Sequence, residues 1–192
     1  MPRVEISTQP TVEPLNLEQL KGELRVTGDE FDADITRILT AARRQVEHDC
    51  QRSLNTQTVK LHLDKFPVER QVMLRRPPVL SVTSVTYVDT DGASQTLAAS
   101  TYHTALIETP QFIQLKTNES WPDTETNTPN AVTIEYQAGY GASGSDVPEE
   151  IRQAVIRMAQ LMWDGCDMCS SDALYLRLIN TARWTFQYDT TA

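Results

Sequence analysis

The fold is decided at residues 56–64, which read TQTVKLHLD. Apolar and polar side chains alternate strictly in this stretch, which is the period of a β-strand with one buried face. The apolar face carries Val59, Leu61 and Leu63, and the polar face carries Lys60, His62 and Asp64. Periodic segments before residue 50 instead repeat at helical spacing, so a strand-forming region begins here.

The strand signals continue toward the C-terminus. Val72 and Leu74 keep the alternation, and residues 85–88 lead through Asp91-Gly92 into residues 96–97, which predicts a hairpin. Weaker strand candidates are residues 102–107, 112–115 and 132–136, and residues 116–130 form a polar loop. These segments predict a small antiparallel β lobe over residues 55–138.

Two helices are predicted before this lobe. Asn16 is placed to cap a first helix whose third position is Gln19, which is the spacing of a capping box. A second helix runs from about Glu30 to about Asp49, because its apolar residues recur at helical spacing. Those residues are Ile35, Ile38, Leu39, Ala42 and Val46.

Helical signals return after the lobe. Pro148 suits the first turn of a helix over residues 147–163, and a last helix covers about residues 171–179. The predicted fold class is therefore α+β, a helical bundle from N- and C-terminal helices with an inserted small antiparallel β lobe. Residues 1–14 are expected as an extended arm, residues 15–180 as a single domain with helices in 15–50 and 147–180, and residues 181–192 as a tail.

The composition narrows the classes of function. Among 192 residues, 26 acidic side chains outnumber 17 basic ones, which argues against a protein that grips duplex DNA through its phosphates. The chain has no long apolar run and no signal-peptide pattern, so we expect a soluble protein without a membrane partner, cytosolic when made. Three cysteines without an export signal favour free thiols.

Two motifs suggest chemistry, and each has a simpler explanation. Residues 139–144 read GYGASG and fit the dinucleotide pattern G-x-G-x-x-G, but no second strand follows the next helix, so a flexible turn is favoured. Cys166 and Cys169 have CxxC spacing, but no second ligand pair accompanies them. No nucleophile elbow is present, and capping explains the acidic pairs at helix starts. We therefore expect no catalytic, cofactor or metal site.

The remaining conspicuous groups are aromatic and basic. Trp184, Phe186 and Tyr188 follow Arg183 in a tail with little periodicity, and such residues often anchor a chain in a partner's pocket. The alternative is that the tail folds back over its own core. The basic doublets Arg43-Arg44 and Arg75-Arg76 lack interleaved aromatic residues, which favours salt-bridging or partner-facing roles.

Several stretches, in their order and spacing, resemble the head-tail connector (adaptor) proteins of tailed bacteriophages, which also occur in gene transfer agents. The resemblance covers most of the chain after residue 14. It is carried by residues 15–26, the acidic opening GDEFDAD at 28–34, LRRPPV at 74–79 with SVTSVTY at 81–87, AGYG at 138–141 and VPEEIRQA at 147–154.

The resemblance implies a non-enzymatic virion protein without cofactors, assembled in the host cytoplasm and placed at the head-tail interface. Its copies form a ring, usually of twelve, that docks on the portal protein, extends the DNA channel and offers a platform to a tail-side stopper, nozzle or tail-completion protein. DNA passes without sequence-specific binding. Trp184, Phe186, Tyr188 and Arg183 are the candidate portal or subunit contacts. The alternatives are a stopper or tail-completion protein and, from another class, a small nucleotide-binding or thiol-dependent enzyme.

Overall fold

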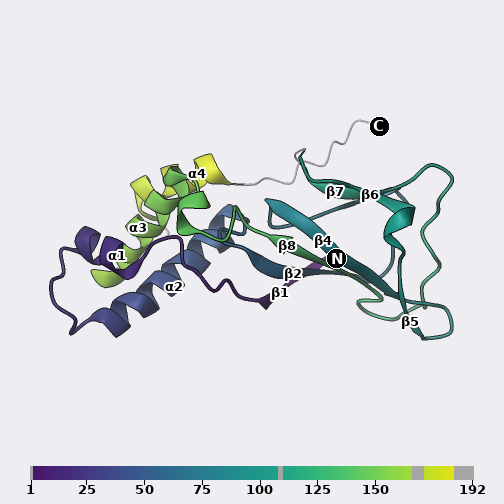
Figure 1. Cartoon of the computed structure of the whole chain (residues 1–192), viewed down its shortest axis with the longest axis horizontal. Helices are drawn as coiled ribbons and strands as arrows, with labels where there is room; N and C mark the ends of the chain where they lie inside the picture. Colours follow the sequence, from purple (N-terminus) through teal and green to yellow (C-terminus); the bar gives the residue numbers. More distant parts are fainter. Residues whose placement is uncertain (1, 108–109, 166–170, 184–192) are drawn as a thin grey trace. The chain divides into compact units, whose positions relative to one another are not determined.

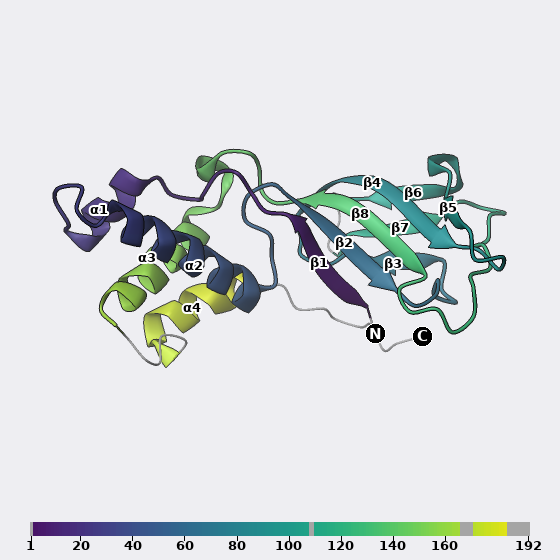
Figure 2. The ribbon, with the colours of Figure 1, turned by 90° about the horizontal axis from the view of Figure 1, so that it is seen from below.

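The computed structural model describes residues 2–107, 110–165 and 171–183, and the chain divides into two compact units. A β unit contains residues 1–9 and 56–139, and a helical unit contains residues 10–55 and 140–192. Figures 1 and 2 show the elements of each unit. The predicted α+β class, with helices from both ends of the chain and an inserted antiparallel β region, is confirmed.

The helical unit contains four α-helices, in the described residues, and a short 3-10 turn. They are α1 (Leu17–Leu24), α2 (Asp32–Cys50), η2 (Gly144–Asp146), α3 (Glu149–Trp163) and α4 (Ala173–Ala182). Their buried faces form one apolar core that includes Leu20, Ile35, Val46, Met158 and Ile179. Since α1 and α2 come from one end of the chain and α3 and α4 from the other, this core joins segments more than a hundred residues apart.

The β unit contains two antiparallel sheets over a shared core. The five-stranded sheet has the order β1 (Arg3–Thr8), β2 (Gln57–Leu63), β8 (Val132–Ala138), β4 (Val79–Val88) and β5 (Ser94–Thr96). The three-stranded sheet has the order β3 (Gln71–Met73), β7 (Phe112–Leu115) and β6 (Tyr102–Ala105), which follows the 3-10 turn η1 (Ala99–Thr101). Val59 and Ile134 from the first sheet and Ile113 from the second are fully buried in the same core.

Most helices and strands lie close to the bounds predicted from local sequence patterns. The capping box at Asn16 forms, since its side chain accepts from the backbone N–H of Gln19 while Gln19 accepts from that of Asn16. The hairpin forms between β4 and β5, where Thr86 pairs with Thr96. The helix predicted over 147–163 begins two residues later, at Glu149, with Pro148 as its N-cap residue.

The expectation of an N-terminal arm at residues 1–14 needs correction. Residues 3–8 form strand β1, which pairs with β2 in antiparallel register, Val4 opposite Leu61. The following residues 10–14 belong to the helical unit. A lone β2 edge would leave its N–H and C=O groups unpaired, and β1 satisfies them. The alternation of Val4 and Ile6 was the short signal for this strand.

The antiparallel β lobe consists of two sheets. Each unit has an apolar core of its own, and the β unit has two sheets because the β6–β7 hairpin pairs with β3 rather than with β4 or β8. Two sheets can bury both of their inner faces against each other, which a single small sheet cannot do.

Tyr136 on β8 fixes the loop that precedes β4. Its hydroxyl donates to the carbonyl of Arg75 at 2.7 Å and accepts from the N–H of the same residue at 3.3 Å. Burial of the side chain raises the pKa of Tyr136 above its ordinary range, so the phenol stays protonated. One buried hydroxyl therefore satisfies two backbone groups of a residue 61 positions away.

We expect Tyr136→Phe to lower the free energy of unfolding of the β unit by about 1–3 kcal/mol, because it leaves the backbone groups of Arg75 without this partner. Tyr87→Phe is the matched control, since the Tyr87 side chain is only half-buried and its hydroxyl has no hydrogen bond within the described residues. Denaturant unfolding of both variants measures the difference. Equal stabilities would contradict the anchoring role of the Tyr136 hydroxyl.

Candidate functional site

A buried ion cluster holds the first half of the helical unit together. The Arg43 guanidinium on α2 donates through Nε to Glu13 at 2.8 Å and through Nη1 to Glu47 at 2.7 Å. The Arg43 side chain is 2% exposed and that of Glu47 is 3% exposed. Glu13 also accepts from the Thr40 hydroxyl, so the segment before α1 is fastened to α2.

The second oxygen of Glu47 extends the cluster to the segment after α2. It accepts from the backbone N–H of Leu54 at 2.9 Å and so fixes the chain where it leaves the helix. The Arg43-Arg44 doublet was expected in salt-bridging or partner-facing roles, and its two members differ: Arg43 is a buried ion-pair residue, whereas Arg44 is exposed. The spacing of Arg43 and Glu47 on the apolar stripe was the available signal for the pair.

Within the glycine-rich stretch, Gly141 and Gly144 are packing positions of the helical unit. A Cβ added at Gly144 would lie 2.7 Å from the carbonyl oxygen of Pro14, and one at Gly141 would meet the Asp146 side chain at 2.1 Å. The carboxylate of Asp146 accepts a hydrogen bond from the backbone N–H of Ser143, close by in the sequence. The glycines therefore allow close approach of the chain to itself, which supports the turn and not the dinucleotide motif.

Helix α4 is fixed to the rest of the helical unit by polar contacts at both ends. At its start Asp172 caps the helix through the N–H of Tyr175 and receives two hydrogen bonds from Arg157 on α3, at 2.8 and 3.1 Å. At its end Arg52 donates to the carbonyl of Ala182 at 2.6 Å. The position of α4 is thereby set by charged groups on α3 and on the segment after α2.

Contacts of α4 and its capping residue Asp172 with α2 and α3 shift three pKa values. The hydrogen bonds from Arg157 lower the pKa of Asp172 to about 2. Burial opposes ionisation of Asp49, but hydrogen bonds from Tyr175 and Gln45 outweigh it and lower the pKa of Asp49. Burial and the neighbouring Asp49 raise the pKa of Tyr175, whose hydroxyl donates to Asp49 at 2.6 Å. Both carboxylates are therefore charged, and Tyr175 is neutral, at neutral pH.

Of the predicted contact residues, the structure describes Arg183 alone. It follows α4 directly and is exposed. Trp184, Phe186 and Tyr188 lie outside the described residues, as do Cys166 and Cys169. Cys50, at the end of α2, is buried, and its thiol lies 4.0 Å from the carbonyl oxygen of Glu47.

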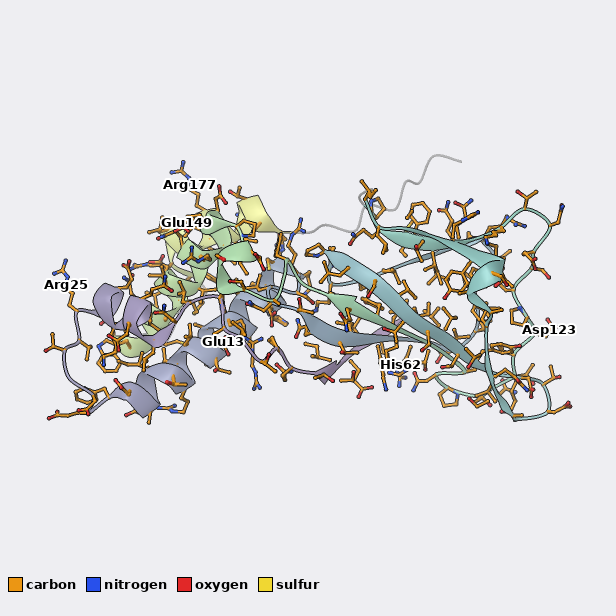
Figure 3. All side chains as sticks on the ribbon, in the orientation of Figure 1. Glu13, Arg25, His62, Asp123, Glu149 and Arg177 are labelled. Carbon is orange, nitrogen blue, oxygen red and sulfur yellow. The ribbon has the colours of Figure 1, made fainter. Side chains whose placement is uncertain are left out.

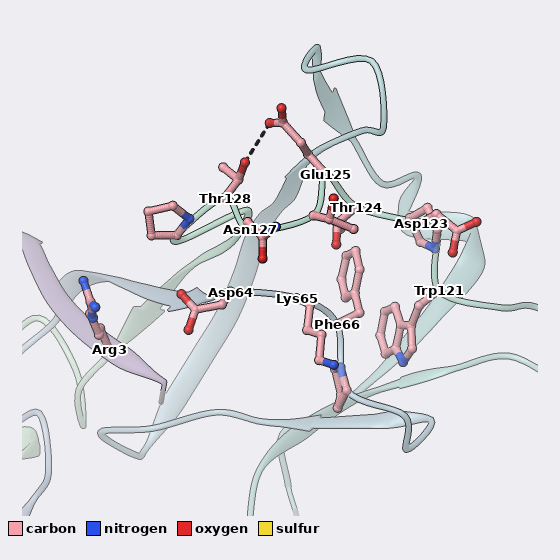
Figure 4. A pocket seen from close by; sticks show the side chains of 14 residues that line it. Arg3, Asp64, Lys65, Phe66, Trp121, Asp123, Thr124, Glu125, Asn127 and Thr128 are labelled. Carbon is pink, nitrogen blue, oxygen red and sulfur yellow. Dashed lines mark hydrogen bonds between the residues drawn. The ribbon is translucent and has the colours of Figure 1, made fainter.

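The β unit has an open pocket of about 790 Å³ (Figure 4). On one side Phe66 and Trp121 stack in parallel with ring centroids 4.8 Å apart, and Trp121 donates to the carbonyl of Glu69. Asp64 accepts from the backbone N–H of Asn130, and this hydrogen bond lowers the pKa of Asp64. The polar groups of the pocket thus serve to order the loop at residues 121–130.

The described residues contain no cluster of three His, Cys, Asp or Glu side chains that could hold a metal ion. None of the helices in the described ranges is long and apolar enough to cross a membrane. The described surface also exposes several large apolar side chains to solvent. The large exposed ones are Val12, Phe31, Val68, Leu80, Ile107, Leu174 and Leu176.

These features define a class of protein: an α+β chain whose described polar groups order its own loops and helices. Residues 15–164 match the head completion protein family. The chain belongs to that family.

Three solved structures have a similar fold. A chain from the virion of a native gene transfer agent particle superposes with a TM-score of 0.80 at 23% identity, covering 97% of each chain. A chain from the neck of an empty particle, computed with C6 symmetry, has a TM-score of 0.80 at 21% identity and covers 97% of this chain and 98% of the other. A chain from the neck of a native particle, computed with C12 symmetry, has a TM-score of 0.74 at 24% identity and covers 96% and 98%.

Among curated proteins, none matches the chain.

Replacing Arg43 tests the ion cluster. We expect Arg43→Ala to lower the free energy of unfolding by about 3–5 kcal/mol, because it leaves the buried carboxylate of Glu47 without its cation. Arg44→Ala removes the same side chain at the exposed neighbouring position and should change stability by less than about 0.5 kcal/mol. Denaturant unfolding compares the two, and similar losses would rule out a special role for the buried pair.

Acid titration tests the α4 anchor. Because the pKa of Asp172 is lowered from 3.8 to about 2 in the folded chain, its contribution to stability is full above pH 3.8 and is lost as pH falls toward 2. Asp172→Asn keeps a capping side chain but removes the charge. We expect the variant to be less stable at pH 6 and to lose less stability between pH 4 and 2. Parallel melting curves of variant and parent across that interval would contradict this.

Proposed function

We propose that the chain is a structural, non-enzymatic head-tail connector (adaptor) of a tailed bacteriophage or a phage-like particle. The observation that carries the proposal is the match of residues 15–164 to the head completion protein family. The similar fold of chains from the neck of gene transfer agent particles supports it. In this role the protein resides in the virion, at the head-tail interface, after assembly in the host cytoplasm.

The proposed working form is a ring of twelve copies beneath the portal protein. Neck chains of similar fold come from particles computed with C6 and C12 symmetry, and copies related by a rotation axis form a closed ring. The ring extends the DNA channel and presents a platform to a tail-side stopper, nozzle or tail-completion protein. Each of these partners would contact a folded surface or a short segment of this chain.

The acidic balance of the chain fits a channel through which DNA slides. With 26 acidic against 17 basic residues, carboxylates facing the channel would repel the phosphate backbone and keep DNA from sticking. We propose that the wall of the channel is lined by such carboxylates and reads no base sequence. A cryo-EM reconstruction of the ring with a strongly basic inner wall would refute this part of the proposal.

The aromatic tail is the proposed contact with the portal. Arg183 is exposed at the end of α4, so the tail starts from a helix that Arg157 and Arg52 hold in place. Large aromatic side chains contribute much of the binding energy in protein interfaces, and Trp184, Phe186 and Tyr188 supply three within five residues.

We therefore expect deletion of residues 184–192 to weaken attachment to portal rings at least about tenfold, the loss of about one strong aromatic contact. The matched control deletes residues 189–192 alone, which removes four small or polar residues and keeps the three aromatic ones. Co-sedimentation of each protein with portal rings measures the attachment. Unchanged binding of the longer deletion would sink the tail as the portal contact.

A further inference from the structure

Two exposed surfaces of the helical unit complement each other in charge, and each also exposes apolar side chains. We propose that they form the contact between neighbouring copies of this chain, the turn between α1 and α2 of one copy against the outer face of α4 of the next. The inference rests on the proposed ring and names the surfaces that close it.

The first surface, called here the acidic turn, centres on Phe31. This ring is 44% exposed and packs edge-on against Trp163, with centroids 5.6 Å apart. Exposed carboxylates occur in the same stretch of chain, those of Glu23, Asp29 and Glu30. None of these three carboxylates has a hydrogen bond or ion pair to another described residue.

Most cations of the acidic turn form ion pairs with carboxylates of the turn itself. Lys21 contacts Asp32 at 2.8 Å, and Arg37 contacts Asp34 at 3.1 Å. The span from residue 18 to residue 37 contains six carboxylates and three cations, and Arg25 is the remaining cation for the three carboxylates of Glu23, Asp29 and Glu30. The acidic turn therefore presents an apolar ring within a negative surface.

The second surface, called here the α4 face, has the opposite charge. Leu174 is 53% exposed and Leu176 is 42% exposed, on either side of the buried stripe of Tyr175 and Ile179. Residues 173–183 contain two arginines, Arg177 and Arg183, and no acidic residue. Arg177 is exposed and has no ion pair within the described part of the chain.

The α4 face is also held rigid before any partner arrives. The bonds from Arg157 to Asp172 and from Tyr175 to Asp49 fix the helix, so its exposed leucines cannot turn inward without breaking them. A pre-ordered apolar surface loses little conformational entropy on docking, which favours its use as a contact.

Charge decides which surface meets which. Two acidic turns, or two α4 faces, would place like charges together, whereas one of each pairs exposed carboxylates with exposed guanidinium groups beside exposed apolar side chains. In Figures 1 and 2 the acidic turn lies at one end of the helical unit and α4 lies toward the other. Figure 3 shows Arg177 pointing away from this unit. A contact between two different surfaces repeats from copy to copy, and it forms a ring when the rotation closes.

Charge reversal with mixing tests this contact. Arg177→Glu and Glu30→Lys each place like charges together when all copies carry the same change, so each variant alone should associate at least about tenfold more weakly than the parent. A mixture of the two variants should assemble again. Every contact in an alternating ring is then either the native pair or the reversed pair. The double variant should assemble for the same reason.

The measurement is sedimentation velocity of the full chain over a concentration series, with negative-stain images of the assembled fraction. Glu150→Lys is the matched control, because it makes the same charge change at an exposed position outside both surfaces, in the first turn of α3. Circular dichroism establishes that each variant is folded. We expect the control to assemble like the parent.

Four outcomes would overturn the inference. They are rings formed by either single variant alone, failure of the mixture to assemble although both variants are folded, a control as weak as the variants, and a parent that stays monomeric at its highest soluble concentration. The first three leave the proposed function untouched, and a monomeric parent bears on its ring form alone; attachment to portal rings tests the role at the head-tail interface separately. Loss of portal attachment with unchanged self-association would assign the two surfaces to the portal instead.

Discussion

The helical unit depends on one buried cation. Arg43 lies inside an apolar core, where an isolated charge would be costly, and two carboxylates from different segments surround it. Because Glu13 precedes α1 and Glu47 also holds the N–H of Leu54, satisfying this cation determines the path of the chain both into and out of the first two helices. Helices α3 and α4 pack against the first two helices, whose geometry this ion cluster fixes.

Segments fixed by short-range patterns were predictable from the sequence. The alternation at residues 56–64, the capping residue Asn16 and the turn at Asp91-Gly92 each specify a local conformation, and each appears in the structure. Strand β1 was missed because two alternating apolar residues, Val4 and Ile6, are too few to separate a strand from an extended arm. The division of the lobe into two sheets could not be predicted, because a local alternation of side chains does not determine which strands pair.

The polar anchors could not be predicted for the same reason. The hydroxyl of Tyr136 reaches the backbone of Arg75 across 61 residues, and that of Tyr175 reaches Asp49 across 126. Each appears in the sequence only as an ordinary residue of a strand or a helix. The group that each hydroxyl binds depends on which distant segment packs beside it. These contacts, and the surfaces that they hold in place, are therefore seen only in the folded chain. The resemblance to a known family predicted the class of protein, whereas the hydrogen bonds and ion pairs of the structure identified the residues of the candidate surfaces.

The division of the chain into units also has a mechanical consequence. The backbone enters the helical unit after residue 9, leaves it after residue 55 and returns after residue 139, so three covalent links join the two units. The units are therefore joined by three backbone connections rather than by a single linker. Cutting any one of them leaves the units tethered, which is a form of redundancy that a protein built from two consecutive domains does not have.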